Sequence, residues 1–285
     1  HHVCFTEEHL LTELVLSCGF LKGVFTDQAW MMIAEKAEAV WKFVRSKCME
    51  PGYRNYMNQG VVGCRGVALG AALLQNLKGG FEEYLEEAYA HHTCLVENYL
   101  SEDGHCAEGG DYFEYSFSTS IVLWHMYALY KGCSAAEVVP QRFRKAGKYL
   151  EALMCAGDRI GRRIPVNCGG GVPCSTLLLV FMTMVCDFPE GNSYLTARFA
   201  GEGIEDTQNA FDFLFYLYYR DKIDLQPYTR PYQSSVVFPQ GGLAAYRRGN
   251  VKLLITAERN PMTGHFHEDR GGIVLEADGD MLLPE

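Results

Sequence analysis

Two different spacings of apolar residues divide the chain. Up to about residue 220, apolar side chains recur every three or four positions, as on one face of a helix. In residues 27–46 this stripe consists of Trp30, Ile33, Ala34, Ala37, Trp41 and Val44. Beyond about residue 233 the period changes to two, which is the spacing of a β-strand with alternating faces. We therefore expect helices first and antiparallel strands after them.

The expected helices differ in how much of their surface is apolar. Residues 60–77 are apolar almost all round and rich in small side chains, which suits an inner helix. Residues 81–100 are amphipathic, and the apolar stretch 118–132 ends at Gly132, a plausible C-terminal cap. Further helices are expected at 141–155, 174–187 and 207–219. Alternation of buried and exposed helices is typical of hairpins that form an inner and an outer ring.

The strand region contains two turn signals. Residues 234–260 predict two strands joined at Gly249–Asn250, and residues 271–285 predict a hairpin that turns at Asp278–Gly279. We therefore divide the chain into a helical domain, 1–224, and a sheet domain, 225–285. A ligand cleft between two such domains is common.

Composition narrows the classes of function. An apolar fraction of 48% in 285 residues allows a large core and excludes wholesale disorder. A net charge of -10 without a long basic run argues against nucleic acid as the main partner. No apolar run of membrane length and no signal peptide is visible, so no membrane partner is expected.

The 11 cysteines include no C-x-x-C pair, which fits buried thiols in a reducing compartment better than a disulfide framework. A cytoplasmic location is therefore favoured. The chain starts "HHVCFTEEHL", without methionine, and a removed leader would instead make the protein periplasmic or secreted.

Three segments bear on the chemistry. The loop "NCGGGVPC" lacks the Lys-Ser/Thr of a P-loop, and no G-x-G-x-x-G follows a strand, so no nucleotide cofactor is expected. In "GHFHEDRGG", alternation along a strand-like run puts His265, His267 and Asp269 on one side. They could be metal ligands, catalytic groups or polar residues on a solvent-exposed face of the sheet. In "EDGHCAEGGDYFEYS", a turn precedes a helix that opens with Tyr112 and Tyr115. These tyrosines are either two aromatic residues of the core, or one of them places its hydroxyl at the mouth of the helical domain.

Taken together, these segments resemble the heparinase II/III-like polysaccharide lyases. Residues 102–116 resemble their D-G-x-x-x-E-G-x-x-Y-x-x-Y signature, and residues 241–285 resemble the start of their β-domain with its G-H-x-H-x-D. Residues 55–73 look like the inner helix that carries their substrate-binding Asn. The resemblance implies an α+β multidomain fold, an N-terminal (α/α) toroid-type helical domain followed by the start of an antiparallel β-sandwich. Relatives usually have more helices before the Asn motif and more β-structure after the H-x-H strand, so the chain looks truncated.

The resemblance implies β-elimination at a uronic acid. Tyr112 and His265 would be the acid/base pair, and Asn58 would stabilise the enolate-like transition state. Many relatives have Asn-His where this chain has Asn58-Gln59, which is closer to a heparinase III-like arrangement. The residues expected to contact substrate are Gln59, Glu108, Tyr115 and Arg247.

The second histidine of the pair has a different role in the resemblance. His267 would be a ligand of a structural divalent metal, zinc or manganese, together with an acidic residue of the next strand. Glu285 is the matching position, where relatives more often have Asp. Asp269 would hydrogen-bond a ligand of the metal without binding the metal itself. The remaining ligand would lie beyond the end of the sequence.

The expected partner is an acidic polysaccharide or oligosaccharide, glycosaminoglycan- or alginate-like. Highly sulfated heparin would be repelled by the net charge unless a local basic cleft offset it, so little sulfation is favoured. The candidates for such a cleft are Arg65, Arg162, Arg163, Arg230, Arg247, Arg248 and Arg270. Alternatives are a toroid glycoside hydrolase with a carboxylate from Asp103 or Glu108, a uronyl epimerase, and an inactive carbohydrate-binding protein. The oligomeric state stays open.

Overall fold

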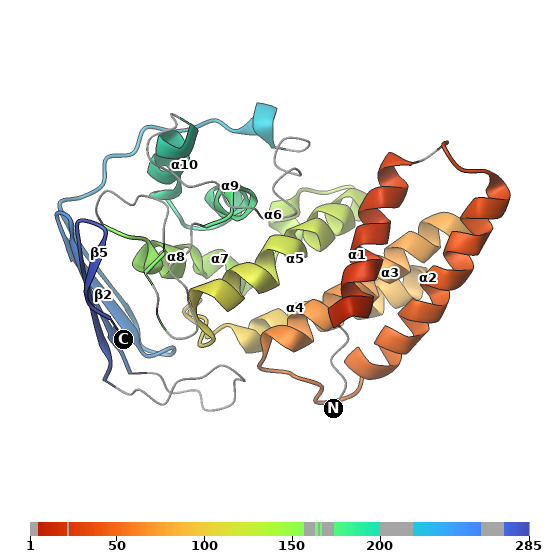
Figure 1. The fold of residues 1–285 in the computed structure, drawn as a ribbon, viewed down its shortest axis with the longest axis horizontal. Helices are drawn as coiled ribbons and strands as arrows, with labels where there is room; N and C mark the ends of the chain where they lie inside the picture. The colour runs from red at the N-terminus through yellow and green to blue at the C-terminus, as the bar shows by residue number, and fades with distance from the viewer. Residues whose placement is uncertain are drawn as a thin grey trace. The chain divides into compact units, whose positions relative to one another are not determined.

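The chain folds into two compact units, which are unit 1 (His1–Asn98) and unit 2 (Tyr99–Glu285). The structure is a computed structural model, drawn in Figure 1. It describes residues 5–21, 23–156, 163–164, 166, 174–199, 219–257 and 271–284. The predicted domain boundary between residues 224 and 225 stays a prediction.

Unit 1 is built around one buried helix. Its helices are α1 (Phe5–Phe20), α2 (Asp27–Cys48), α3 (Asn58–Lys78) and α4 (Glu82–Tyr99), and α1 and α2 both pack against α3 (Figure 1). The predicted inner helix is confirmed, because α3 is buried along most of its length. Small residues allow this packing. A Cβ atom on Gly66 would lie 2.4 Å from Glu8 Cγ, and one on Gly70 would lie 2.6 Å from Trp41 Cδ1.

Helix α3 is also long and apolar enough to cross a membrane, and it is the only described helix that is. Most of its apolar surface is buried inside unit 1, which is what the core helix of a globular unit shows.

A buried ion pair joins α1 to α3. Arg65 Nε donates to Glu8 Oε1 at 2.8 Å, and Arg65 Nη2 donates to the same oxygen. Thr12 Oγ1 also donates to Glu8 Oε1, at 3.0 Å. Burial raises the pKa of Glu8, but the neighbouring charges of Arg65 and His9 outweigh it and hold that pKa below its usual value. Glu8 is therefore ionised at neutral pH, and its charge depends on Arg65.

Unit 2 begins with a helical part that has an aromatic core. Its elements are α5 (Gly109–Lys131), α6 (Ala135–Val138), α7 (Gln141–Lys145), α8 (Gly147–Leu153), α9 (Thr176–Val185), α10 (Gly191–Phe199) and the 3₁₀ turn η1 (Arg220–Lys222). Phe143 of α7 lies 4.8 Å from Phe117 and 4.6 Å from Trp124 of α5, measured between ring centroids. Gly132 ends α5 in a left-handed conformation, φ 68°, which confirms the predicted cap.

The single helix predicted at 141–155 is wrong, because the structure divides it into α7 and α8 at Ala146. The carbonyl of Arg144 accepts a hydrogen bond from Asp187 N at 3.3 Å. In a continuous helix that carbonyl would bond the amide of Lys148, so the contact with Asp187 favours a break here. The helix predicted at 174–187 is α9, Thr176–Val185. The helix predicted at 207–219 lies almost entirely outside the described residues.

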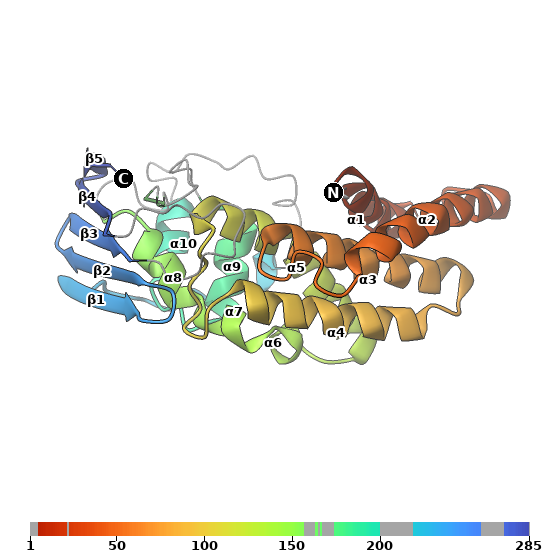
Figure 2. The ribbon, with the colours of Figure 1, turned by 90° about the horizontal axis from the view of Figure 1, so that it is seen from below.

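The described strands form one antiparallel sheet in sequential order. They are β1 (Gln233–Phe238), β2 (Leu243–Arg248), β3 (Val251–Thr256), β4 (Ile273–Ala277) and β5 (Asp280–Leu283), seen side by side in Figure 2. The register confirms the predicted turns at Gly249–Asn250 and Asp278–Gly279. The first of the two strands predicted in 234–260 is wrong, because a turn at 239–242 divides it into β1 and β2. The order of helices followed by an antiparallel sheet confirms the predicted fold class.

The two faces of the sheet differ in their surroundings. The inner face is buried and includes apolar residues such as Phe238, Leu254 and Val274, with α8 packed against β2. The outer face carries exposed apolar side chains, namely Val237, Tyr246, Val251, Ile255 and Ile273. An apolar outer face is what one layer of a β-sandwich has.

The ion pair of unit 1 gives the first test. Arg65→Met should lower the free energy of unfolding by about 3–5 kcal/mol, because it leaves the Glu8 carboxylate buried without its partner. Lys42→Met is the matched control, because Lys42 forms an exposed pair with Glu38 at 2.7 Å. That loss should stay below about 1 kcal/mol. Denaturant unfolding measures both, and equal small losses would contradict the importance of the buried pair.

Candidate functional site

The segment that precedes α5 is bonded to the turn between β1 and β2. Asp103 Oδ2 accepts hydrogen bonds from the backbone amides of Gln240, at 2.8 Å, and Gly241, at 3.4 Å. Ser101 Oγ donates to the other oxygen. Burial raises the pKa of Asp103, but these donors outweigh it and keep that pKa below its usual value. The carboxylate of Asp103 therefore acts as a structural acceptor.

His105 and two glycines complete this contact. The His105 ring meets the Tyr149 ring edge-on, with 4.9 Å between centroids. A Cβ atom on Gly241 would lie 2.2 Å from Cγ of that histidine, so only glycine allows the turn to approach so closely. Gly104 has φ 86°, which confirms the predicted turn at Asp103–Gly104. The first half of the signature thus joins the helical part of unit 2 to its sheet.

The second half of the signature begins α5 and carries the tyrosines. Glu108 stands at the N-cap position with 0% exposure, and Gly109 follows with φ 87°. Tyr112 is half-buried, and Tyr115 is 36% exposed, so neither ring belongs to the core. Tyr112 lies in the first turn of α5, near the positive end of the helix dipole.

Arg163 holds the first turn of α5 through several hydrogen bonds. Its Nη1 donates to the Gly110 carbonyl at 3.0 Å and to Glu114 Oε2 at 2.5 Å, and its Nη2 donates to Asp111 Oδ1 at 2.8 Å. Arg163 is only 2% exposed. Burial works against its charge, but the Glu114 and Asp111 carboxylates outweigh this and raise its pKa. Arg163 therefore partly neutralises two acidic residues of α5.

The predicted asparagine belongs to unit 1. Asn58 is the first residue of α3 and is buried. Gln59 follows it, and its Oε1 is buried without a hydrogen-bond partner among the described residues. A Cβ atom on Gly60 would lie 2.4 Å from the Arg54 carbonyl oxygen, so glycine lets the preceding loop pass close to this end of the helix. Both amide side chains thus stand at the positive end of α3.

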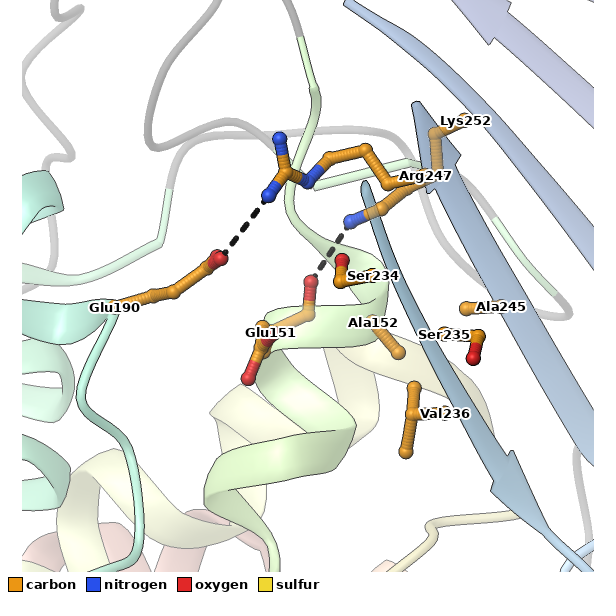
Figure 3. A pocket seen from close by; sticks show the side chains of 9 residues that line it. All are labelled: Glu151, Ala152, Glu190, Ser234, Ser235, Val236, Ala245, Arg247 and Lys252. Carbon is orange, nitrogen blue, oxygen red and sulfur yellow. Dashed lines mark hydrogen bonds and ion pairs between the residues drawn. The ribbon is translucent and has the colours of Figure 1, made fainter. Parts of the chain in front are cut away.

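Arg247 lies in a small polar pocket on the inner face of the sheet (Figure 3). The pocket is lined by Glu151, Ala152, Glu190, Ser234, Ser235, Val236, Ala245, Arg247 and Lys252. Arg247 Nη2 donates to the Pro231 carbonyl at 2.5 Å and lies 3.5 Å from Glu190 Oε1. Arg230 Nε lies 3.6 Å from the other oxygen of Glu190. The predicted contact between Arg247 and substrate stays a prediction.

Lys252 is the second buried cation of this pocket, at 4% exposure. Its Nζ donates to the Glu151 carbonyl at 2.8 Å and to the Met154 carbonyl at 2.5 Å, at the C-terminal end of α8 (Figure 3). Burial lowers the pKa of Lys252 to about 8, opposed by the carboxylates of Glu190 and Glu151. The same burial raises the pKa of the Glu151 carboxyl, as does the charge of Glu190.

Several predicted residues lie outside the described part of the chain. These are His265, His267, Asp269, Glu285, Arg162 and Arg270. Among the residues that the structure does describe, no group of three or more His, Cys, Asp or Glu side chains gathers to hold a metal. The roles of His265 as acid/base and of His267 and Glu285 as ligands therefore stay predictions.

Sequence reasoning missed the specific partners of Arg163 and the role of Lys252. Arg163 is 49 residues from Glu114 and 52 from Asp111, and Lys252 is 98 residues from Met154. No local pattern links such distant residues. The one available signal was a lysine at an inward-facing strand position, between Val251 and Leu253.

Comparison with solved structures identifies the fold. The chain is similar to heparinase III, with a TM-score of 0.69, 15% sequence identity, and coverage of 99% of this chain and 42% of that chain. The predicted heparinase-like fold, a helical toroid followed by a β domain, is confirmed. The chain spans less than half of the heparinase III chain. No protein-family description matches this sequence, and no curated protein matches it.

The buried ammonium of Lys252 predicts a pH dependence. Below pH 8 its charged form is penalised by burial, and the penalty disappears as pH rises from about 8 to the ordinary pKa of lysine, about 10.4. In this window the unfolded chain binds more protons, so the stability of the wild type should rise with pH, by up to about 3 kcal/mol. Glu190, Glu151, Arg230 and Arg247 face the same ammonium and modulate it.

The measurement is the difference in unfolding free energy between wild type and Lys252→Met from pH 7 to 10.5. This difference should change in favour of the wild type as pH rises, whereas the exposed control Lys145→Met should show no such change. A pH-independent difference for Lys252→Met would mean that the ammonium is not destabilised by burial.

Proposed function

We propose that this chain is part of a polysaccharide lyase that cleaves a uronic-acid-containing polysaccharide or oligosaccharide by β-elimination. The observation that carries the proposal is the heparinase III-like fold over 99% of the chain, with Tyr112 of the signature in the first turn of α5 and outside the core. The three sequence motifs of the lyase family also occur in order along the chain.

The first chemical task is to make the C5 proton of the uronate removable. That proton is weakly acidic while the neighbouring carboxylate keeps its negative charge. Asn58, helped by Gln59, would donate hydrogen bonds to this carboxylate from the positive end of α3. These donors stabilise the negative charge that accumulates on the carboxylate as the proton leaves.

The second task is proton transfer. Tyr112 and His265 would share it: one group removes the C5 proton, and the other delivers a proton to the departing glycosidic oxygen. The electrons of the C5–H bond form the C4–C5 double bond as the C4–O bond breaks, so no water is consumed. A free tyrosine has a pKa of about 10. Tyr112 stands in the first turn of α5, and Arg163 pairs with Asp111 and Glu114 of the same helix.

The structure gives less support to the glycoside hydrolase alternative. A hydrolase of this kind needs two carboxylates that face the substrate. Asp103, one of the two candidate carboxylates, is already bonded to the amides of Gln240 and Gly241. An epimerase would share the removal of the C5 proton, so it differs from a lyase only in its product.

A substrate with little sulfation fits the described arginines. Arg65 pairs with Glu8, Arg163 pairs with Asp111 and Glu114, and both Arg230 and Arg247 lie beside Glu190. Each of these four arginines therefore already has a carboxylate beside it, whereas Arg248 is exposed and lies over the Tyr232 ring. Sulfate groups would have to find cations elsewhere.

We further propose that His267 and Glu285 hold a structural zinc or manganese ion, with no part in the proton transfers.

The reaction predicts a specific product. Incubation with a panel of uronate polysaccharides should give at least one product that absorbs ultraviolet light through its new double bond. In mass spectrometry the product pair should contain no added water. Added water would assign the protein to the hydrolases, and an intact chain with inverted C5 would assign it to the epimerases.

Substitutions test the roles of the residues. Tyr112→Phe should lower kcat by about 10²–10⁴-fold, because it removes a general acid or base. Asn58→Ala should lower it comparably through lost transition-state stabilisation. Tyr130→Phe, in the last turn of the same helix, is the matched control and should keep most of the turnover. Unchanged kcat in Tyr112→Phe, together with a large loss in Tyr115→Phe, would reverse the assignment.

A further inference from the structure

A continuous set of buried polar contacts connects the middle of the sheet with the first turn of α5. On the sheet side it begins at Lys252 of β3 and Glu276 of β4, which are cross-strand partners on the inner face. Lys252 Nζ donates to the carbonyls of Glu151 and Met154. Glu276 Oε2 accepts a hydrogen bond from Ala156 N at 2.9 Å. Both charged groups therefore hold the C-terminal end of α8 and the residues that follow it.

The end of α8 is in turn bonded to the segment that carries Arg163. Met154 and Arg163 form an isolated antiparallel bridge, and Ile164 N donates to the Leu153 carbonyl at 2.6 Å. The Arg163 side chain then bonds Gly110 and Asp111 in the first turn of α5 and Glu114 in the turn that follows. A Cβ atom on Gly110 would lie 3.3 Å from Arg163 Cδ, so a small residue lets the arginine lie against the helix.

The cost of burying these charged groups indicates that their contacts contribute more to the relative positions of the connected segments than to the stability of the fold. Burying an ammonium or a guanidinium costs several kcal/mol, and well-packed apolar residues in place of a buried ion pair are often as stable or more stable. Lys252, Glu276 and Arg163 are nevertheless all almost fully buried. Hydrogen bonds are directional, so each of these groups fixes its neighbour in one orientation, which apolar packing alone does less strictly.

We propose that Lys252, Glu276 and Arg163 are positioning residues, which hold the first turn of α5, and with it Tyr112, in a fixed place relative to strands β3 and β4. The catalytic meaning of this connection rests on the proposed function. The expected effect on the rate follows from the displacement of Tyr112, the proposed acid or base. A displacement of about 1 Å can lower a rate by roughly 10²-fold.

Kinetics of single and double variants test the connection. Lys252→Met and Arg163→Met should each lower kcat by about 10–100-fold while KM changes less than about threefold, because orientation is lost and binding is retained. The double variant should be little worse than the worse single variant, since both changes break one connection. Arg163→Lys should recover part of the loss. Lys131→Met at the far end of α5 is the matched control and should keep wild-type kinetics.

An activity-independent measurement separates this proposal from the proposed function. In protein labelled with 3-fluorotyrosine, comparison with Tyr112→Phe assigns the fluorine resonance of Tyr112. Lys252→Met should shift or broaden that resonance, although Lys252 contacts no residue of the α5 first turn in the described contacts, and Lys131→Met should leave it unchanged. If no uronate is cleaved by the wild type, the proposed function fails and the resonance still decides the connection.

Two outcomes would overturn the proposal. One is an unchanged Tyr112 resonance in Lys252→Met and Arg163→Met. The other is a lower melting temperature with wild-type kcat, which would make the contacts merely stabilising. If Lys252→Met does not fold, Glu276→Gln replaces it, because it removes the charge and keeps the shape of the side chain. The same shift of the Tyr112 resonance is then expected.

Discussion

Buried polar contacts, among them the two hydrogen bonds from Lys252 to the end of α8, join the sheet of unit 2 to its helical part. The inner face of the sheet is not an ordinary apolar surface, since Lys252, Arg247 and Glu276 are buried within it. Each of these charges requires a partner, and the partners come from the end of α8, the residues around it and the loop before β1. The sheet is therefore fixed by directional bonds as well as by packing, and a displaced sheet would leave charges buried without partners.

The signature of residues 102–116 combines two physical tasks in one short segment. Asp103, Gly104 and His105 bind the turn between β1 and β2, and they need a carboxylate, a left-handed residue and a flat ring for that contact. Gly109 and Gly110 then begin α5 and let Arg163 lie against it. Tyr112 and Tyr115 stand on the helix that these contacts hold. Most residues of this signature thus make structural contacts that position the start of α5, which carries the tyrosines.

Much of the fold could be predicted because its signals are local. The inner helix 60–77, the cap at Gly132 and the turn at Gly249–Asn250 each follow from a few neighbouring residues. The errors have non-local causes. The break at Ala146 accompanies a bond from Asp187 to the Arg144 carbonyl, and the turn that divides β1 from β2 is bonded to Asp103, more than a hundred residues earlier. For the site, Tyr112 and Asn58 stay predictions from the resemblance, and no local pattern could show the contacts of Arg163 with Asp111 and Glu114 or of Lys252 with the end of α8.

The most direct test of the central claim is a crystal structure of Tyr112→Phe bound to a short uronate oligosaccharide. The account predicts that a uronate binds with its C5 facing the ring of residue 112. The distance from a tyrosine oxygen restored at that ring to C5 should be about 3–3.5 Å, as reacting groups require. An oligosaccharide bound elsewhere, or one whose C5 faces away from residue 112, would contradict the account.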